Sequence, residues 1–235
     1  MKKKILFVGA SFAQVPPIKY AKKMGYYVVA CDQNKKSPGF KYCDESYIIS
    51  TTNKKKIYEL SKKLKINGII TYVSDTASPA VSYVAKKLNL KGLPIKAVNT
   101  LVYKNLFRKF LKKNNFNYPE FKIFRSKEKI NNFIDKIGYP FFIKPIDSSG
   151  SKGVTKVVKK IFIKKAISEA LNYSRKKRFI IEKIIERKGY QVAGDGFVMN
   201  KKLVFRCWGD EHFNEKLNGL ITIGPSLPSV HQEKK

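Results

Sequence analysis

The residues with the clearest chemical potential lie in one segment, residues 141–154, which read FFIKPIDSSGSKGV. The apolar run 141–143 predicts a β-strand, and it places Lys144 near the strand's end, where the ammonium group has a fixed position. The following residues, 147–153, supply small side chains, two glycines and a second lysine. Backbone N–H groups in such a loop can turn toward an anion without obstruction. The segment therefore predicts a loop that closes over a polyphosphate.

The same loop has a simpler interpretation, a glycine-rich hairpin with solvated lysines. Its composition alone favours neither interpretation. It is not a P-loop, because the spacing G-x-x-x-x-G-K-[ST] is absent and no helix need follow. The choice depends on the elements that surround the loop.

The first hundred residues alternate strand and helix signals. Strands are expected at ILFVG, YVVACD and GIITYV, and helices at about 13–24, 54–64 and 77–88. Such alternation predicts an α/β unit with a parallel sheet covered on both faces. Ligands of these sheets lie beyond the carboxyl ends of the strands, which would bring Ser11, Asp32 and the loop 74–76 to a small molecule. Capping and turn formation explain the same residues equally well.

From about residue 99 the pattern changes to that of an α+β unit. We expect a helix over 100–114, followed by the segment NYPEFKIF, a helix near 128–137, the strand at 141, a strand at VTKVVKK, a helix near 164–174 and the apolar run RFIIEKII. The segment VAGDGFVMNKKLVFRCW then predicts two strands joined by a turn at Asn200 and Lys201, followed by an irregular tail. The expected fold class is thus α/β and α+β.

Composition narrows the class of function. The 235 residues carry a formal net charge of +32, which is typical of nucleic-acid-binding proteins. However, only six of the 49 basic residues are arginine, and the lysines are spread along the whole chain. We therefore expect no specific nucleic-acid binding, only weak adhesion at low salt.

Three cysteines at unrelated spacings predict neither a disulfide framework nor a zinc site. No apolar run is long enough to span a bilayer, so we expect a cytoplasmic location and no membrane partner.

The order of these motifs resembles the ATP-grasp superfamily, in particular its carbamoyl-phosphate-synthase-like and biotin-carboxylase-like branch. The segment SPGFKYCDE, the helix beginning VYKNLFRKF, the Lys144 strand with its loop, and the run IIEKII carry the resemblance. It implies a parallel-sheet pre-ATP-grasp domain over 1–98. It further implies an ATP-grasp small (lid) subdomain over 99–180 and an incomplete start of the large subdomain over 181–235.

The resemblance also implies a nucleotide site. Lys104, with Arg108 one turn on, would reach the phosphates, Lys144 the α-phosphate, and the lid 148–153 the β- and γ-phosphates. The hinge after residue 180 would read adenine, with Glu182 accepting from its amine, and Gln191 could replace the family's ribose-binding glutamate. Separately, the strand LVFRCW would carry Asp210, Glu211 and His212 toward the phosphates, although a solvated turn explains them as well. The expected nucleotide-binding residues are Lys104, Lys144, Ser148, Ser149, Gly150, Ser151, Lys152, Gly153, Glu182, Lys183, Ile184, Ile185, Gln191 and His212.

In this family the γ-phosphoryl group of ATP passes to a carboxylate, and an amine or similar nucleophile attacks the acylphosphate. The implied cofactors are ATP and Mg²⁺, and the implied partners are a small-molecule carboxylate and an amine. We expect the family's acidic metal ligands to lie beyond Lys235, so no catalytic residue and no metal ligand is assigned. We therefore expect no turnover from the chain alone, and an incomplete sheet that leaves Phe197, Val204 and Trp208 partly uncovered and open to self-association. The alternatives are a non-catalytic nucleotide-binding module or fragment and, less favoured, a basic nucleic-acid-binding protein.

Overall fold

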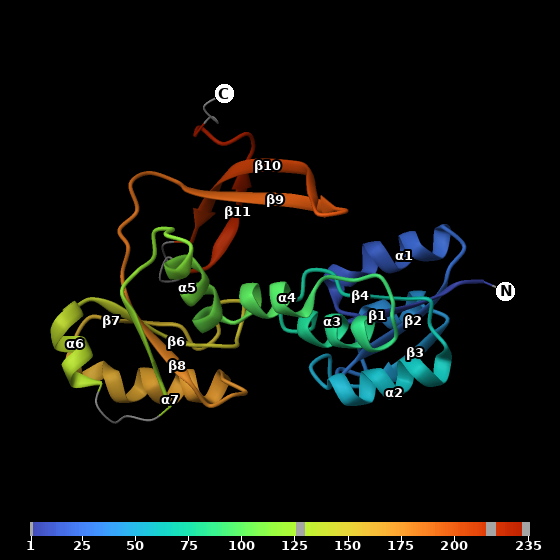
Figure 1. Ribbon diagram of the computed structural model, residues 1–235, viewed down its shortest axis with the longest axis horizontal. Coiled ribbons are helices and arrows are strands. Elements are labelled where there is room, and N and C mark those ends of the chain that lie inside the picture. The colour runs from blue at the N-terminus through green and yellow to red at the C-terminus, as the bar shows by residue number, and fades with distance from the viewer. Residues whose placement is uncertain (1, 126–129, 215–219, 232–235) are drawn as a thin grey trace.

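The fold was analysed in a computed structural model, which describes residues 2–125, 130–214 and 220–231. The described chain forms three sheets (Figure 1). The first is parallel, with the order β3-β2-β1-β4, and its strands are β1 (Lys4–Val8), β2 (Tyr27–Asp32), β3 (Glu45–Ile48) and β4 (Gly68–Ile70). The predicted parallel sheet is thus confirmed. Strand β3 was not predicted, because ESYI is a short edge strand with alternately half-buried and exposed residues and carries little apolar signal.

Helices cover both faces of this parallel sheet. On one face α2 (Lys54–Leu64) and α3 (Ser78–Lys87) pack on Leu6 and Val8, and on the other α1 (Val15–Lys23) packs on Phe7. Successive residues of β1 therefore serve opposite cores, as a strand's period of two requires. Two 3₁₀ turns, Phe12–Gln14 and Pro38–Tyr42, follow the strands β1 and β2.

Two short helices, α4 (Ile95–Val102) and α5 (Lys104–Lys113), link the first sheet to the second. The prediction of one helix over 100–114 is wrong, because Tyr103 is extended, with φ −91° and ψ 112°. The physical reason is a tertiary contact: the backbone N–H of Lys104 donates to the carbonyl of Ile146 at 2.9 Å, in place of a partner within a helix. The break places Lys104 at the start of α5.

The second sheet is antiparallel, with the order β5-β8-β6-β7. Its strands are β5 (Phe121–Phe124), β6 (Phe141–Pro145), β7 (Thr155–Val157) and β8 (Phe179–Lys183). Helices α6 (Asn131–Ile137) and α7 (Ile163–Tyr173) contribute to its core, and a 3₁₀ turn over Lys160–Phe162 precedes α7. The start of the helix predicted near 128–137 lies partly outside the described residues. Strands β6 and β7 pair directly, so the loop between them is the loop of a hairpin.

The third sheet, of order β11-β10-β9, is also antiparallel. It comprises β9 (Gln191–Met199), β10 (Lys202–Phe213) and β11 (Thr222–Ser226). The tail predicted to be irregular therefore contains a strand, which pairs with the end of β10. The prediction that Phe197, Val204 and Trp208 are partly uncovered is confirmed, with exposed fractions of 61%, 52% and 41%.

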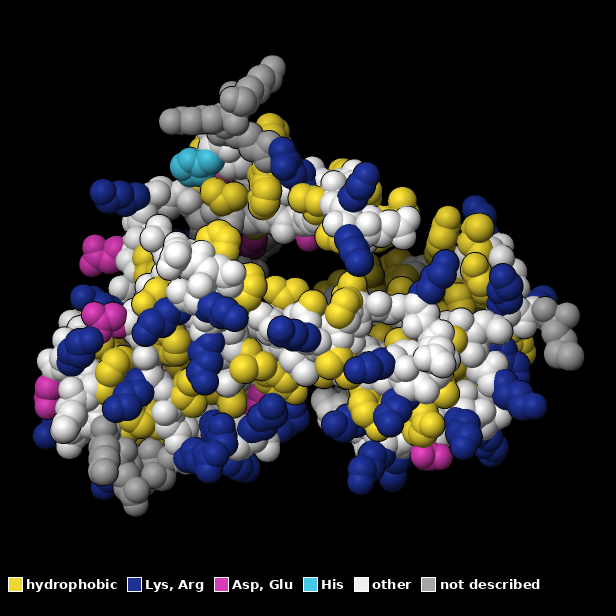
Figure 2. Space-filling model, viewed as in Figure 1, with side chains coloured by type: hydrophobic (Ala, Val, Ile, Leu, Met, Phe, Trp, Pro, Cys, Tyr) yellow, Lys and Arg dark blue, Asp and Glu magenta, His cyan; other side chains and the backbone are white. Residues whose placement is uncertain are grey.

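Basic side chains are spread over the molecule rather than gathered on one element. Figure 2 shows Lys and Arg across the whole visible face, with hydrophobic side chains exposed among them. Among the described residues, no helix combines the length and the apolar character that a membrane crossing needs.

Candidate functional site

Strand β6 presents Lys144 on one face and buries Phe141 and Ile143 on the other. Because side chains alternate along a strand, Lys144 shares its face with Phe142, whose cross-strand partner is Glu182 of β8. The Lys144 Nζ lies 2.8 Å from Glu182 Oε2 and 4.7 Å from the centroid of the Phe142 ring. Its position is fixed by the strand and by both contacts.

Glu182 is only 1% exposed and holds two cations. Besides Lys144, it binds Arg108 of α5 through both carboxylate oxygens, Nε to Oε1 at 2.8 Å and Nη2 to Oε2 at 3.2 Å. Burial tends to raise the pKa of this carboxyl, but the charges of Lys144 and Arg108 outweigh it and hold the pKa below the usual range. Sequence reasoning missed the cluster, although a glutamate inside the run IIEKII already required a cationic partner if the strand was buried.

Lys104 lies at the start of α5 and reaches the loop after β6. Its Nζ donates to the carbonyl of Ser148 at 2.5 Å. Burial, and next the nearby charge of Lys144, lower the pKa of Lys104. Two lysines from distant segments therefore converge at one end of β6.

The loop itself has the backbone that its glycines predict. Gly150, Ser151 and Gly153 adopt φ values of +63°, +55° and +73°, a region that glycine enters at little cost. Ser151 Oγ donates to the carbonyl of Leu220 at 3.0 Å, which connects the loop to the segment before β11. The loop thus closes a hairpin and also lines a cavity, so the two interpretations of its sequence are compatible.

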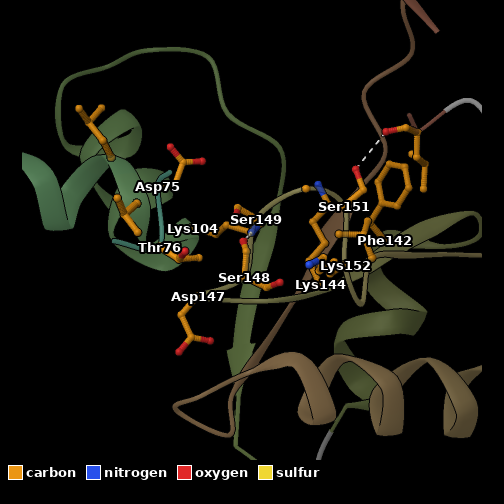
Figure 3. Close-up of a pocket in the computed structure, with 15 residues that line it drawn as sticks. Asp75, Thr76, Lys104, Phe142, Lys144, Asp147, Ser148, Ser149, Ser151 and Lys152 are labelled. Atoms are coloured by element: carbon orange, nitrogen blue, oxygen red, sulfur yellow. Dashed lines mark hydrogen bonds between the residues drawn. The ribbon is translucent and has the colours of Figure 1, made fainter. Parts of the chain in front are cut away.

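A cavity of about 450 Å³ lies between this loop and the first unit. Figure 3 shows Lys144 and Lys152 on one side of it and Asp75 and Thr76 on the other, with Lys104 and Ser149 between them. Of the predicted nucleotide-binding residues, the cavity brings together Lys104, Lys144, Ser148, Ser149, Gly150, Ser151 and Lys152. Sequence reasoning placed Asp75 and Thr76 near a ligand through their loop, but it missed Leu101, Val102, Phe142, Asp147, Val154 and Leu220.

The other predicted site residues lie outside this cavity lining. Gly153 packs at the far end of the loop, and Lys183, Ile184, Ile185 and Gln191 lie on the segment that leaves β8 and enters β9. Asp32 accepts hydrogen bonds from the amides of Ala10 at 3.0 Å and Asn34 at 2.9 Å, which is a turn-forming role.

His212 lines a separate cavity of about 540 Å³, together with Tyr190 and Glu211. Its Nε2 lies 3.0 Å from Ser226 Oγ, across the β10–β11 pair. Asp210 is buried and accepts from Ser229 Oγ at 2.6 Å and from the Val230 amide at 2.8 Å, so it organises the segment after β11. The structure does not bring these three residues into the Lys144 cavity.

Acidic residues that could hold Mg²⁺ are few in the cavity. Its carboxylates are Asp75 and Asp147, and Asp147 is 1% exposed and already hydrogen-bonded. Across residues 2–125, 130–214 and 220–231, no three His, Cys, Asp or Glu side chains gather as a metal-binding group. Cys31, Cys43 and Cys207 are free cysteines.

Comparison with known proteins supports the expected family. The family model described as the D-ala D-ala ligase C-terminus matches residues 110–204. Among curated proteins, the formate-dependent phosphoribosylglycinamide formyltransferase of Prochlorococcus marinus (strain MIT 9515) is 26% identical over 182 residues, which are 75% of this chain and 46% of that protein. The protein of the same name from Francisella tularensis subsp. holarctica (strain OSU18) is 26% identical over 186 residues, 78% of this chain and 48% of that protein. The chain spans about half the length of the curated relatives it matches.

Solved structures show the same fold. An N5-carboxyaminoimidazole synthetase from Staphylococcus aureus, complexed with ADP, superposes with a TM-score of 0.77 at 17% identity, over 98% of this chain and 60% of that one. An L-amino acid ligase from Bacillus licheniformis gives a TM-score of 0.68 at 16% identity, over 100% of this chain and 56% of that one. The chain thus has the fold of these ATP-grasp proteins, and the family model, together with the lysines and loop at the end of β6, supports its place in the ATP-grasp superfamily.

Proposed function

We propose that the chain binds ATP in the Lys144 cavity, and that its parent activity is ATP-dependent ligation of a carboxylate to an amine or a similar nucleophile. The observation that carries the proposal is the convergence of Lys104, Lys144 and the loop 148–152 on one cavity. Two lysines at a strand end and a helix start, beside a loop of small residues, suit a polyanion.

The electrostatics of the lysines support the same proposal. Lys104 is largely buried, and both burial and the charge of Lys144 lower its pKa, so its ammonium form is destabilised in the ligand-free protein. A polyphosphate between the two lysines would offset the repulsion between them. The favourable energy of binding then comes partly from relief of repulsion that is already present in the fold.

Within this proposal each residue contacts a different part of the nucleotide. Lys144 binds the α-phosphate, Lys104 the phosphates beyond it, and residues 148–153 cover the β- and γ-phosphates. The backbone of residues 183–185 reads the adenine edge. Glu182 has both oxygens engaged by Arg108 and Lys144, so we assign it first to the orientation of Lys144. Ribose contact by Gln191 and phosphate contact by His212 remain predictions.

The proposed chemistry has two steps. A carboxylate oxygen attacks the γ-phosphorus, and ADP leaves with the electrons of the broken bond. The nucleophile then attacks the carbonyl carbon of the acylphosphate, and phosphate leaves. Such transfers depend on positioning and charge neutralisation, which the two lysines and the loop amides would provide. The names of the relatives mention formate and amino acids, both of which carry a carboxylate.

A second candidate function is nucleotide binding without ligation. The observation that favours it is that Asp147, one of the two carboxylates in the cavity lining, already accepts hydrogen bonds through both oxygens. We also propose the boundaries 1–98, 99–180 and 181–235 for the pre-ATP-grasp domain, the small subdomain and the start of the large one, and a cytoplasmic location.

Calorimetry with ATP tests the proposal. Replacement of Lys144 by Ala should weaken binding by at least about tenfold, since a charge-assisted hydrogen bond contributes roughly 1.5–3 kcal/mol. Lys156 is a matched control, because it lies exposed on β7 and outside the cavity, so Lys156→Ala should bind as the wild type does. Equal affinity in Lys144→Ala and the wild type would overturn the proposed site. Release of phosphate that depends on Mg²⁺ and on an added carboxylate separates the ligase from the binding module.

A further inference from the structure

We infer that Asp147 is a positioning residue that, together with Ser174, clamps the base of the loop 148–153 and thereby fixes the place where Lys104 meets the loop. The link to nucleotide rests on the proposed function. The clamp itself rests on geometry in the ligand-free protein.

Both carboxylate oxygens and the backbone carbonyl of Asp147 accept hydrogen bonds. Ser174 Oγ donates to Oδ1 at 2.7 Å, and the Lys176 amide donates to Oδ2 at 3.0 Å. Arg175 donates through Nη2 to the Asp147 carbonyl, and its Nε lies 4.0 Å from Oδ2. With 1% exposure, this carboxylate would be costly to bury without such partners.

The partners all belong to the turn between α7 and β8. Ser174 is itself buried, and its Oγ accepts from the Arg178 amide at 3.1 Å. One hydroxyl thus binds Asp147 on one side and, on the other, the residue that directly precedes β8. In Figure 3 the Asp147 carboxylate points away from the loop's tip, toward this turn.

The far end of the loop rests on the same helix. Gly153 has φ +73°, and a Cβ added there would lie 3.0 Å from the Tyr173 side chain and 3.3 Å from the Glu169 carbonyl. One end of the loop therefore contacts the turn that follows α7, and the other end lies against the C-terminal part of α7 itself. Residues 148–152 form the tip between these two fixed points.

Lys104 donates hydrogen bonds to the two residues that flank Asp147 in the sequence. Its amide donates to the Ile146 carbonyl at 2.9 Å, and its Nζ donates to the Ser148 carbonyl at 2.5 Å. A further contact joins the start of α5 to the turn that holds Asp147, since Lys176 Nζ lies 3.8 Å from the centroid of the Tyr103 ring. A shift at Asp147 would therefore move both acceptors of Lys104.

A plain structural role predicts something different. If Asp147 only completed the α7–β8 turn, its replacement would loosen that turn and leave the contacts of Lys104 unchanged. If Asp147 acts as a clamp, its replacement also loosens residues 146–148 and the hydrogen bonds that Lys104 donates to them. The amides of Lys104 and Val154 report on this, because they donate to the loop carbonyls of Ile146 and Ser151.

The experiment measures amide exchange by NMR on the ligand-free full chain. We expect Asp147→Asn and Ser174→Ala to speed exchange at Lys104 and Val154 by about tenfold, the effect of losing one or two buried hydrogen bonds. Ser174→Thr restores the hydroxyl and should stay within about twofold of the wild type. Glu120→Gln is the carboxylate control, because Glu120 pairs with Lys136 at an exposed site and should change nothing.

Unchanged exchange at Lys104 and Val154 in Asp147→Asn, with faster exchange in the turn alone, would overturn the clamp. If Asp147→Asn does not fold, the comparison of Ser174→Ala with Ser174→Thr decides the question. In parallel, calorimetry should show weaker ATP binding in Ser174→Ala and recovery in Ser174→Thr. A wild type that does not bind ATP would overturn the proposed function, and the exchange result would still decide the clamp.

Discussion

Replacement of Glu182 by Gln should destabilise the β6–β8 strands by about 3 kcal/mol at pH 7. Glu182 is 1% exposed, and Lys144 and Arg108 around it have side-chain exposures of 18% and 19%. Removal of the charge leaves two largely buried cations without their counter-ion, and breaking such a pair costs about 3–5 kcal/mol. The glutamine amide keeps one acceptor oxygen, so we expect a cost at the lower end of this range. Glu120→Gln removes an exposed pair with Lys136 and should cost less than about 1 kcal/mol.

The pH dependence of the stability difference between the wild type and Glu182→Gln gives an independent check. The pKa of Glu182 is lowered in the folded chain, whereas an unfolded glutamate titrates near about 4.3. The carboxylate's contribution is therefore complete above that value and is lost as the pH falls toward the lowered pKa of the folded state. Native-state amide exchange of β6 and β8, at several pH values, measures it. The reasoning would be refuted if Glu182→Gln lost no more stability than Glu120→Gln. It would also be refuted if the stability difference between Glu182→Gln and the wild type persisted at low pH.

Three further changes have defined outcomes. Gly194→Ala should alter the emission of Trp208, the single tryptophan, because a Cβ would lie 2.1 Å from its ring, whereas the matched Gly196→Ala meets only a flexible side chain at 3.0 Å. Asn53→Ala should lower the unfolding free energy by about 1 kcal/mol, measured with urea, through loss of the N-cap hydrogen bond of α2. Saturating ATP should slow amide exchange in residues 148–153, and unchanged exchange would contradict the proposed lid.

Much of the fold could be predicted because local signals agreed with it. Helix α2 begins and ends where it was expected, since Asn53 caps it and its apolar residues recur at helical spacing. The errors have tertiary causes. The break at Tyr103 arises from a hydrogen bond to a residue more than forty positions away, and β11 forms only because β10 provides an edge. No local pattern encodes either contact.

The candidate site shows the same division. Lys144 and the loop were recognisable because their chemistry is contained in one short segment. The partners of Glu182 were not, because Arg108 comes from a helix 74 residues earlier. Asp147 reads in the sequence as one more polar residue of a turn, and only burial and its bonds to Ser174 and Lys176 distinguish it.

The buried Glu182 connects the stability of the fold to the proposed binding. An ammonium group has three donors, and Glu182 takes one of those of Lys144, so the others can bind a phosphate while the ion pair persists. Arg108 engages both oxygens of Glu182 and keeps the carboxylate in place. The rotamer entropy of Lys144 is therefore lost on folding rather than on binding, which favours affinity. The same ion pair that stabilises β6 against β8 thus presents the lysine to its ligand.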